Sequence, residues 1–332
     1  MALKEVEPKN IYVRINVPDY TVLRKNRDNT VLETDLNVME WTTPTYNWAT
    51  PTRSWYNFTW WNPTPAPIYS DTDYTAQFEL PYLCFTAKSA GAYLRLDKRG
   101  SPTSVTLETS TDWSTRTTYT FWTYIILSNV GDKVYWRNTS TTTTGFSTAV
   151  NTDFYNFVTA DNFDCSWDIT YLLNKNWTTT LSNSCFVQLF TWCSKLYSAP
   201  ELPATTLANN CYWYMFQNCA NLTTPPKLPA TTLAEQCYRN MFSWCTNLTA
   251  LPKLSALYYN NISCYEMFKW CSKIKLSTSK TWDYQTAYRI PTSWSGSTQS
   301  TNSLYNMFAN TGWTFTWTPT INTTYYTSNT LV

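Results

Sequence analysis

The clearest pattern of hydrophobic and polar positions in this chain is a motif that returns every 26 residues. The segment MFSWCTNL at 241–248 has close copies at 215–222 and 267–274 and a looser copy at 189–196. The same step separates three sets of apolar residues: Phe190, Phe216, Phe242 and Phe268; Cys193, Cys219, Cys245 and Cys271; and Leu196, Leu222, Leu248 and Ile274. A period of this length is typical of proteins whose repeats bury their apolar faces against one another.

Within one unit, the apolar spacing predicts a short helix followed by a short strand. Leu233, Cys237 and Met241 lie four residues apart, which favours a helix. The following segment TNLTALPKL, residues 246–254, has single apolar positions between Thr and Pro and predicts a strand and a turn. A repeat made of one strand and one helix belongs to the leucine-rich-repeat class.

The repeated motif also resembles a known family. Its pattern, LPATTLA followed by CY, MF, C, LT and P, is similar to the BspA-like leucine-rich repeats of surface proteins and phage fibre proteins associated with gut Bacteroidales. The match covers roughly residues 160–330, about half of the chain. The resemblance implies a C-terminal α/β leucine-rich-repeat-like solenoid over residues 161–332, with 26-residue units at about 185–276.

Upstream of the repeats, short runs of alternating residues predict strands. Segments such as SVTLETS at 104–110 favour an antiparallel β-sandwich over residues 76–160. IYVRINV and TVLETDLNV predict two further strands within residues 1–42, and the Pro-, Thr- and Trp-rich residues 43–68 favour a linker or an extended arm. The predicted fold class is therefore multi-domain: a β-rich N-terminal attachment region at 1–75, the β-sandwich, and the α/β solenoid.

The composition offers little catalytic chemistry. The chain has no histidine, no phosphate-binding loop and no dinucleotide-binding glycine pattern, so we predict no enzymatic activity, no cofactor and no metal. Asp161, Asp164 and Asp168 could form a calcium or paired-carboxylate site, but a capping or solvated role is favoured. A net charge of +2 without a basic block argues against nucleic-acid binding, and no apolar run is long enough for membrane insertion.

Eight of the ten cysteines lie in the repeat, at 185, 193, 211, 219, 237, 245, 264 and 271. Because they recur with the repeat, these cysteines are expected to act as small buried apolar residues and to keep reduced thiols. Disulfides and a metal site are the alternatives, although the C-x7-C spacing is unusual for metal ligands. We predict in particular that Cys211, Cys219, Cys237 and Cys245 are buried and unpaired.

The aromatic content is the remaining functional signal, with 25 Tyr, 18 Trp and 15 Phe. Exposed Trp and Tyr are rigid contacts in binding surfaces and stack on sugar rings. Tyr212, Tyr238 and Tyr265 are predicted to be interior or edge residues of the repeats. The candidate binding surface consists of Trp192, Trp244 and Trp270 in the repeats and Trp55, Trp60 and Trp61 in the predicted linker.

One column of the repeat holds Trp192, Asn218, Trp244 and Trp270. If a helix ends there, this column is the position at which the backbone adopts positive φ and Gly or Asn is preferred. The chain has only six Gly, about 2% against a usual ~7%. Two interpretations follow. In the first, the positions are Gly-like in backbone conformation, and Trp arises from drift, from a codon such as UGA that genetic codes read differently, or from an uncertain assignment. In the second, the indoles are genuine and line one edge of the repeats as a binding surface. Both place all four residues at equivalent surface turns.

Two functional hypotheses remain. The first is a non-enzymatic phage virion surface protein, a fibre or decoration subunit, that attaches to other virion proteins through residues 1–75 and binds a host surface protein or glycan. The second is a bacterial cell-surface adhesin. The start of the chain, MALKEVEPKN, lacks the apolar core of a secretory signal, which favours the virion. Self-association is expected in either case, and an enzyme acting on glycans is a more remote third hypothesis.

Overall fold

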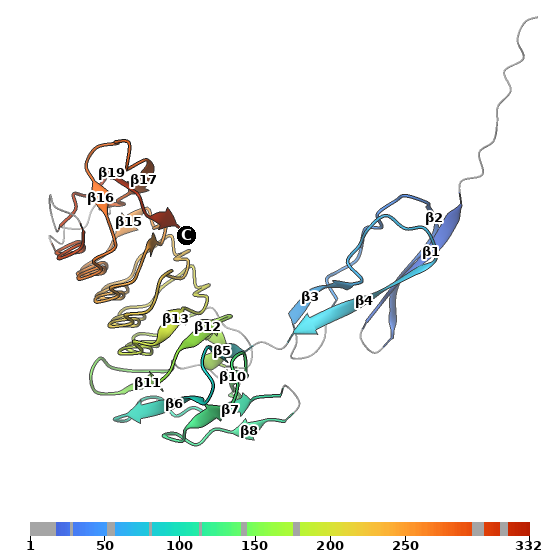
Figure 1. Ribbon diagram of the computed structural model, residues 1–332, viewed down its shortest axis with the longest axis horizontal. Coiled ribbons are helices and arrows are strands. Elements are labelled where there is room, and N and C mark those ends of the chain that lie inside the picture. The colour runs from blue at the N-terminus through green and yellow to red at the C-terminus, as the bar shows by residue number, and fades with distance from the viewer. Residues whose placement is uncertain are drawn as a thin grey trace, which may run out of the picture. The chain divides into compact units, whose positions relative to one another are not determined.

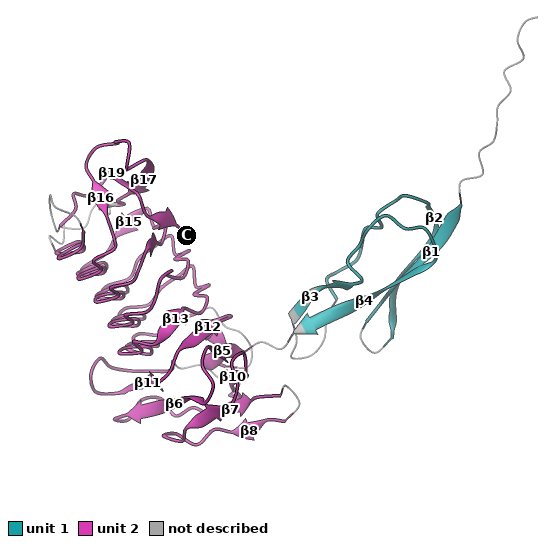
Figure 2. Cartoon of the chain, viewed as in Figure 1, with its two compact units in different colours: residues 1–81 teal, residues 82–332 magenta. Residues whose placement is uncertain are grey.

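The computed structural model describes residues 18–26, 29–51, 57–79, 82–112, 115–140, 145–174, 180–293, 302–312 and 318–332. The chain divides into two compact units, Met1–Pro81 and Tyr82–Val332, which Figure 2 shows in separate colours. Each unit has its own hydrophobic core. The two are described separately below.

Unit 1 is a four-stranded sheet with the order β2-β1-β4-β3. Its strands are β1 (Asp19–Lys25), β2 (Val31–Met39), β3 (Asn57–Asn62) and β4 (Thr72–Glu79). β1 pairs antiparallel with β2 and parallel with β4, and β3 pairs antiparallel with β4. Strand β3 lies inside the segment 43–68 that the sequence predicted as a linker or arm, so part of that segment belongs to the sheet.

The core of unit 1 contains a buried arginine. Arg24 is only 1% exposed and pairs with Glu33 at 2.8 Å and Asp35 at 2.9 Å, both from the neighbouring strand β2. Its guanidinium also lies 5.6–5.8 Å from the ring centres of Tyr46, Trp61 and Tyr74. Two carboxylates at Nη1 and three ring faces offset part of the cost of removing this charge from water.

Unit 2 begins with two sheets. The larger has the order β13-β12-β5-β10-β7-β8 and the smaller has the order β11-β6-β9. The elements are β5 (Leu83–Ala87), β6 (Ala92–Arg99), β7 (Leu107–Ser110), β8 (Thr117–Thr118), β9 (Ile125–Leu127), β10 (Lys133–Asn138), β11 (Phe154–Thr159), β12 (Phe163–Ser166), the 3-10 helix η1 (Ile169–Leu172) and β13 (Leu196–Ser198).

The two sheets pack through aromatic side chains. Phe157 on β11 lies 4.7 Å from Phe85 on β5 and 5.2 Å from Trp136 on β10, and it also stacks on Phe190 of the first repeat at 5.4 Å. One core therefore runs from the sheets into the repeats. The arrangement fits the predicted antiparallel β-sandwich only loosely, because β13 from the repeat region joins the larger sheet in parallel with β12.

The predicted C-terminal α/β solenoid is wrong. In the part of the chain that the structure describes, the only helix is η1, and the repeats contain short strands in several small sheets. These strands are β14 (Ala250–Leu251), β15 (Tyr258–Tyr259), β16 (Leu276–Ser277), β17 (Thr286–Arg289), β18 (Thr292–Ser293), β19 (Thr324–Thr327) and β20 (Thr330–Leu331). The described fold is all-β, with long runs of turns where helices were predicted.

A residue with positive φ at every fourth position replaces the predicted helix. In one repeat these are Asn210 at 60°, Tyr214 at 58° and Asn218 at 61°. Each such residue interrupts a right-handed helix. The amides then alternate between two partners: Gln217 N donates to Tyr214 O within its turn at 3.1 Å, whereas Phe216 N donates to Met241 O in the next repeat at 2.9 Å. Half of the turn amides thus join consecutive repeats into the layers visible in Figure 1.

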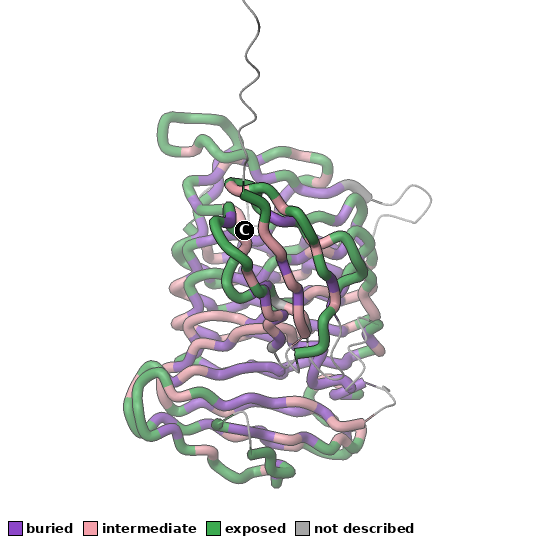
Figure 3. The backbone as a smooth tube through the Cα atoms, turned by 90° about the vertical axis from the view of Figure 1, so that its right-hand side faces the viewer, coloured by how far each residue is buried: buried purple, intermediate pink, exposed green. Residues whose placement is uncertain are grey.

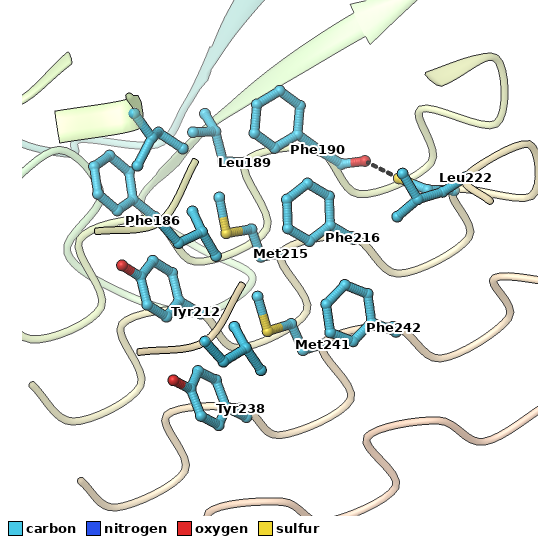
Figure 4. Close-up of a cluster of buried hydrophobic side chains, with 14 of the residues drawn as sticks. Phe186, Leu189, Phe190, Tyr212, Met215, Phe216, Leu222, Tyr238, Met241 and Phe242 are labelled. Atoms are coloured by element: carbon cyan, nitrogen blue, oxygen red, sulfur yellow. Dashed lines mark hydrogen bonds between the residues drawn. The ribbon is translucent and has the colours of Figure 1, made fainter. Parts of the chain in front are cut away.

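Equivalent side chains of successive layers stack in columns inside unit 2. The rings of Phe190 and Phe216 are 5.3 Å apart, and those of Phe216 and Phe242, and of Phe242 and Phe268, are 5.6 Å apart. Figure 4 shows this column beside the parallel columns of Met and Tyr side chains. On the opposite part of each layer, single parallel bridges such as Ser198 to Thr224 keep the same 26-residue register.

Candidate binding surface

The turn segments of the repeats present side chains in pairs. The alternation of two buried and two more exposed residues is clearest at 211–218, where Cys211–Tyr212 and Met215–Phe216 are buried while Trp213–Tyr214 and Gln217–Asn218 are partly exposed. This period of four follows from the left-handed residue at every fourth position. Figure 3 shows the resulting alternation of buried and less buried residues along the layers. The outward pairs form one surface, which we call the turn face.

One column of the turn face combines aromatic rings with an arginine. The guanidinium of Arg239 lies between the rings of Trp213 and Tyr265, at 4.4 Å and 4.9 Å from their centres. Tyr265 in turn stacks on Tyr305 with ring centres 5.4 Å apart. These four residues come from consecutive layers, and all are partly or fully exposed. We call them the arginine–aromatic column.

Polar side chains lie beside this column. Glu266 accepts a hydrogen bond from Asn240 Nδ2 at 3.0 Å through one carboxylate oxygen and pairs with Lys269 at 2.8 Å through the other. Arg239 Nη1 donates to Gln236 Oε1 at 2.8 Å. The turn face therefore offers both charge signs and the partly exposed Gln236 amide next to its aromatic rings, a composition suited to polar ligands with an apolar side.

A second column of the turn face holds the predicted tryptophans. Trp192, Asn218, Trp244 and Trp270 have φ of 66°, 61°, 67° and 65°, and they occupy equivalent positions in four layers. The three indoles are 71%, 42% and 37% exposed, respectively, and Trp244 stacks on Trp270 with ring centres 4.7 Å apart. The predicted placement at positive-φ surface turns is confirmed, and the backbone there is of the type that favours Gly.

The other three candidates belong to unit 1, and the two that the structure describes, Trp60 and Trp61, do not form one surface. Trp55 lies outside the described residues. Trp60 is 55% exposed on β3, whereas Trp61 is 6% exposed and packs edge-on against Tyr46 and Phe58. Adjacent strand residues point to opposite faces of a sheet, so Trp61 is a core residue of unit 1, whereas Trp60 is available for contact.

All ten cysteines are free and buried, which confirms the prediction for Cys211, Cys219, Cys237 and Cys245. Four thiols donate to backbone carbonyls of the preceding layer: Cys193 to Phe157, Cys219 to Phe190, Cys245 to Phe216 and Cys271 to Phe242, at 3.0–3.1 Å. Burial raises the pKa of the Cys193, Cys211 and Cys264 thiols to about 12. These thiols are therefore structural rather than reactive.

The acidic cluster separates into different local roles. Asp168 caps η1 and accepts from Thr170 N at 2.7 Å and from Thr170 Oγ1 at 2.8 Å, as the capping interpretation predicted. Asp164 pairs with Lys88 at 2.8 Å. Among the described residues, no group of three or more acidic or cysteine side chains could hold a metal ion.

In the same residues, no helix is long and apolar enough to span a membrane.

The arginine–aromatic column does not follow from the sequence pattern. Its members Trp213, Arg239 and Tyr265 follow the 26-residue step, but they differ in residue type and so do not stand out as a repeated motif. Tyr265 was grouped with Tyr212 and Tyr238, which are 1% and 2% exposed. The Cys-Tyr pair comes one residue later at 264–265, while the layers keep the 26-residue register. Cys264 therefore takes the place of Tyr238 in the next layer, and Tyr265 lies on the turn face.

Comparisons with protein-family models, with curated proteins and with solved structures give no match for this chain. The resemblance to BspA-like repeats therefore stays a prediction, and the function rests on the chain's own geometry.

Proposed function

We propose that this chain is a non-enzymatic surface protein of a phage virion, a fibre or decoration subunit whose repeats bind a glycan or protein of the host surface. The observation that supports this proposal is the arginine–aromatic column. It displays Trp213, Arg239, Tyr265 and Tyr305 in register on one face of the stacked layers.

The column suits a repetitive, polar ligand. Neighbouring backbones in paired layers lie about 4.8 Å apart, so a chain lying along the stack meets a ring or a guanidinium at each step. Trp and Tyr give large contact areas with few rotatable bonds, and Arg adds hydrogen-bond donors in a fixed plane. Because the side chains already stack on one another, little conformational entropy is lost when a ligand binds.

Unit 1 is proposed to attach the protein to the particle. It is compact by itself, and strand β2 exposes several apolar side chains: Val31 is 49% exposed, Leu36 66% and Met39 61%. Apolar groups gathered on a surface are typical of protein interaction sites. We expect unit 1 to contact other virion proteins and copies of the same chain.

The test of the binding face uses the triple variant Arg239→Ala, Tyr265→Ala, Tyr305→Ala. Binding of the purified chain to intact host cells and to an array of bacterial surface polysaccharides is compared with that of the unmodified chain. We expect at least a tenfold loss of affinity. The matched control is Tyr124→Ala, since Tyr124 is similarly exposed, at 46%, but lies outside the repeats. Equal binding by the triple variant and the unmodified chain would contradict the proposal.

The test of attachment deletes residues 1–81 and measures incorporation into particles by immunoblotting of purified virions. We expect the truncated chain to be absent from virions while it remains soluble in the lysate. Normal incorporation would contradict the attachment role. Display of the full chain on the envelope of the bacterium that makes it would favour the adhesin hypothesis instead.

A further inference from the structure

Among the described residues, six tryptophans adopt the left-handed backbone conformation. They are Trp41, Trp122, Trp167, Trp192, Trp244 and Trp270, with φ between 65° and 72°. Three of them lie in one column of the repeats, and the others lie in three separate turns of both units. The feature is therefore not a property of the repeat alone.

The left-handed conformation brings Cβ close to the backbone carbonyl, so Gly adopts it most readily and Asn is the next choice. The described part of this chain follows that rule closely. Four of its five glycines, Gly91, Gly100, Gly131 and Gly145, have positive φ. Of the 21 other described residues with positive φ, nine are Asn. Trp, with six, is the second most frequent residue in this set, although its bulk gives it no advantage there.

Aromatic character does not explain the enrichment. The chain has 25 Tyr and 15 Phe, yet among the described residues of these two types only Tyr214 has positive φ. If these turns had been selected to display aromatic rings, Tyr and Phe would share them with Trp. The association is specific to Trp.

Most of the six side chains also differ from the tryptophans of the two cores. Trp136 is completely buried and lies edge-on against Tyr119 at 4.5 Å, and Trp61 is a core residue of unit 1. Neither has positive φ. In contrast, Trp41 is 67% exposed, Trp122 46% and Trp192 71%. Exposure alone does not define the left-handed set, because Trp60 is 55% exposed and Trp282 is 89% exposed without positive φ. Trp167, in turn, has positive φ and stacks on Tyr135 with ring centres 5.8 Å apart. The property that the six share is the backbone conformation.

We infer that the six left-handed tryptophans are glycine in the protein made by its natural producer. The cause we assign is a codon, UGA for example, that one genetic code reads as tryptophan and another as glycine. The packed tryptophans, Trp136 and Trp61, would then be specified by the ordinary tryptophan codon. Separate drift at six positions would not choose left-handed turns each time.

This inference changes the binding face without depending on the proposed function. With glycine at 192, 244 and 270, the column beside Asn218 carries no indoles. Ligand contact on the turn face then falls to the arginine–aromatic column, in which none of Trp213, Arg239, Tyr265 and Tyr305 has positive φ.

The test is peptide mass spectrometry of the protein isolated from its natural source. Trypsin releases residues 240–253, which contain Trp244, and residues 270–273, which begin with Trp270. We expect both peptides to be lighter by the mass difference between tryptophan and glycine. Residues 134–137, with Trp136, are the internal control and should keep tryptophan. Tryptophan at 244 or 270, or glycine at 136, would overturn the inference. None of these outcomes bears on whether the turn face binds a host ligand.

Discussion

The thiol of Cys219 donates a hydrogen bond to the backbone carbonyl of Phe190, over a distance of 3.1 Å and a sequence separation of 29 residues. The same carbonyl accepts the amide of Cys193 at 3.0 Å. One Phe carbonyl thus receives two donors, one from its own layer and one from the next. This contact explains why Cys, a small residue with a weak donor, recurs at this position.

We predict that these thiols do not react in the folded protein. Iodoacetamide at pH 8 should label none of the ten cysteines within an hour, because all are buried and burial keeps them protonated. After unfolding in guanidinium chloride, all ten should react. Rapid labelling of Cys219 or Cys245 before unfolding would show that the layers open locally.

Removal of one thiol should have a measurable effect on stability. Cys245→Ala loses the hydrogen bond to Phe216 O and leaves a small cavity in the column. We expect the free energy of unfolding to fall by about 1–2 kcal/mol, measured by urea titration. Cys245→Thr is the stricter test, since its hydroxyl can donate to Phe216 O while its methyl group fills the space. A threonine variant no better than the alanine variant would contradict a contribution from both the hydrogen bond and the filled space.

The same burial predicts a loss of stability in alkaline solution. Burial raises the pKa of Cys193, Cys211 and Cys264 from 9.0 to about 12, and that of Tyr119 and Tyr155 from 10.0 to about 12. Above pH 9 the unfolded thiols ionise while the folded ones do not, so stability is fully present below pH 9 and declines as pH rises towards 12. Each thiol contributes a loss of about 1.4 kcal/mol per pH unit in that window. Urea midpoints at pH 8 and pH 10.5 check this, and equal midpoints would contradict it.

In unit 1, Glu33→Gln should be strongly destabilising. The substitution removes one of the two carboxylates that compensate the buried Arg24. Loss of a buried ion-pair partner typically costs about 3–5 kcal/mol. The control is Asp73→Asn, which breaks the more exposed pair with Lys25 and should change stability by less than about 1 kcal/mol. Thermal unfolding followed by circular dichroism distinguishes the two, and similar effects would show that Arg24 is solvated.

The sequence was sufficient to predict the layers but not their local structure. Identical residues 26 apart, such as Phe216 and Phe242, predict that units stack, and their rings do stack. The helix prediction failed because Leu233, Cys237 and Met241 repeat at a spacing of four, which a 3.6-residue helix and a run of four-residue turns both satisfy. The turns are distinguished from a helix by the residues that precede or follow these apolar positions. Gln236, Asn240 and Trp244 all adopt positive φ.

The candidate surface was predicted in part for a related reason. The Trp column was recognised because its members share one residue type with a fixed step. Trp61 was misplaced because Pro and Thr in residues 43–68 indicated a linker, whereas strand pairing of β3 with β4 buries one face of that segment. Pairing with a distant strand is a tertiary effect that local composition does not reveal.

The last prediction concerns Trp192, which is 71% exposed at φ 66°. A left-handed conformation costs a residue with a Cβ about 1–2 kcal/mol, and Gly avoids this at an entropic cost of about 0.5–1 kcal/mol. Trp192→Gly and Trp192→Asn should therefore stabilise unit 2 by up to about 1 kcal/mol, a rise in Tm of roughly 2–4 °C for a domain of this size. Trp192→Ala is the matched control, because it removes the indole but keeps the Cβ, and it should give no rise. Differential scanning calorimetry measures all three. If Ala stabilises as much as Gly, the exposed indole rather than the backbone causes the strain, and the backbone at 192 is not Gly-like in its energetics.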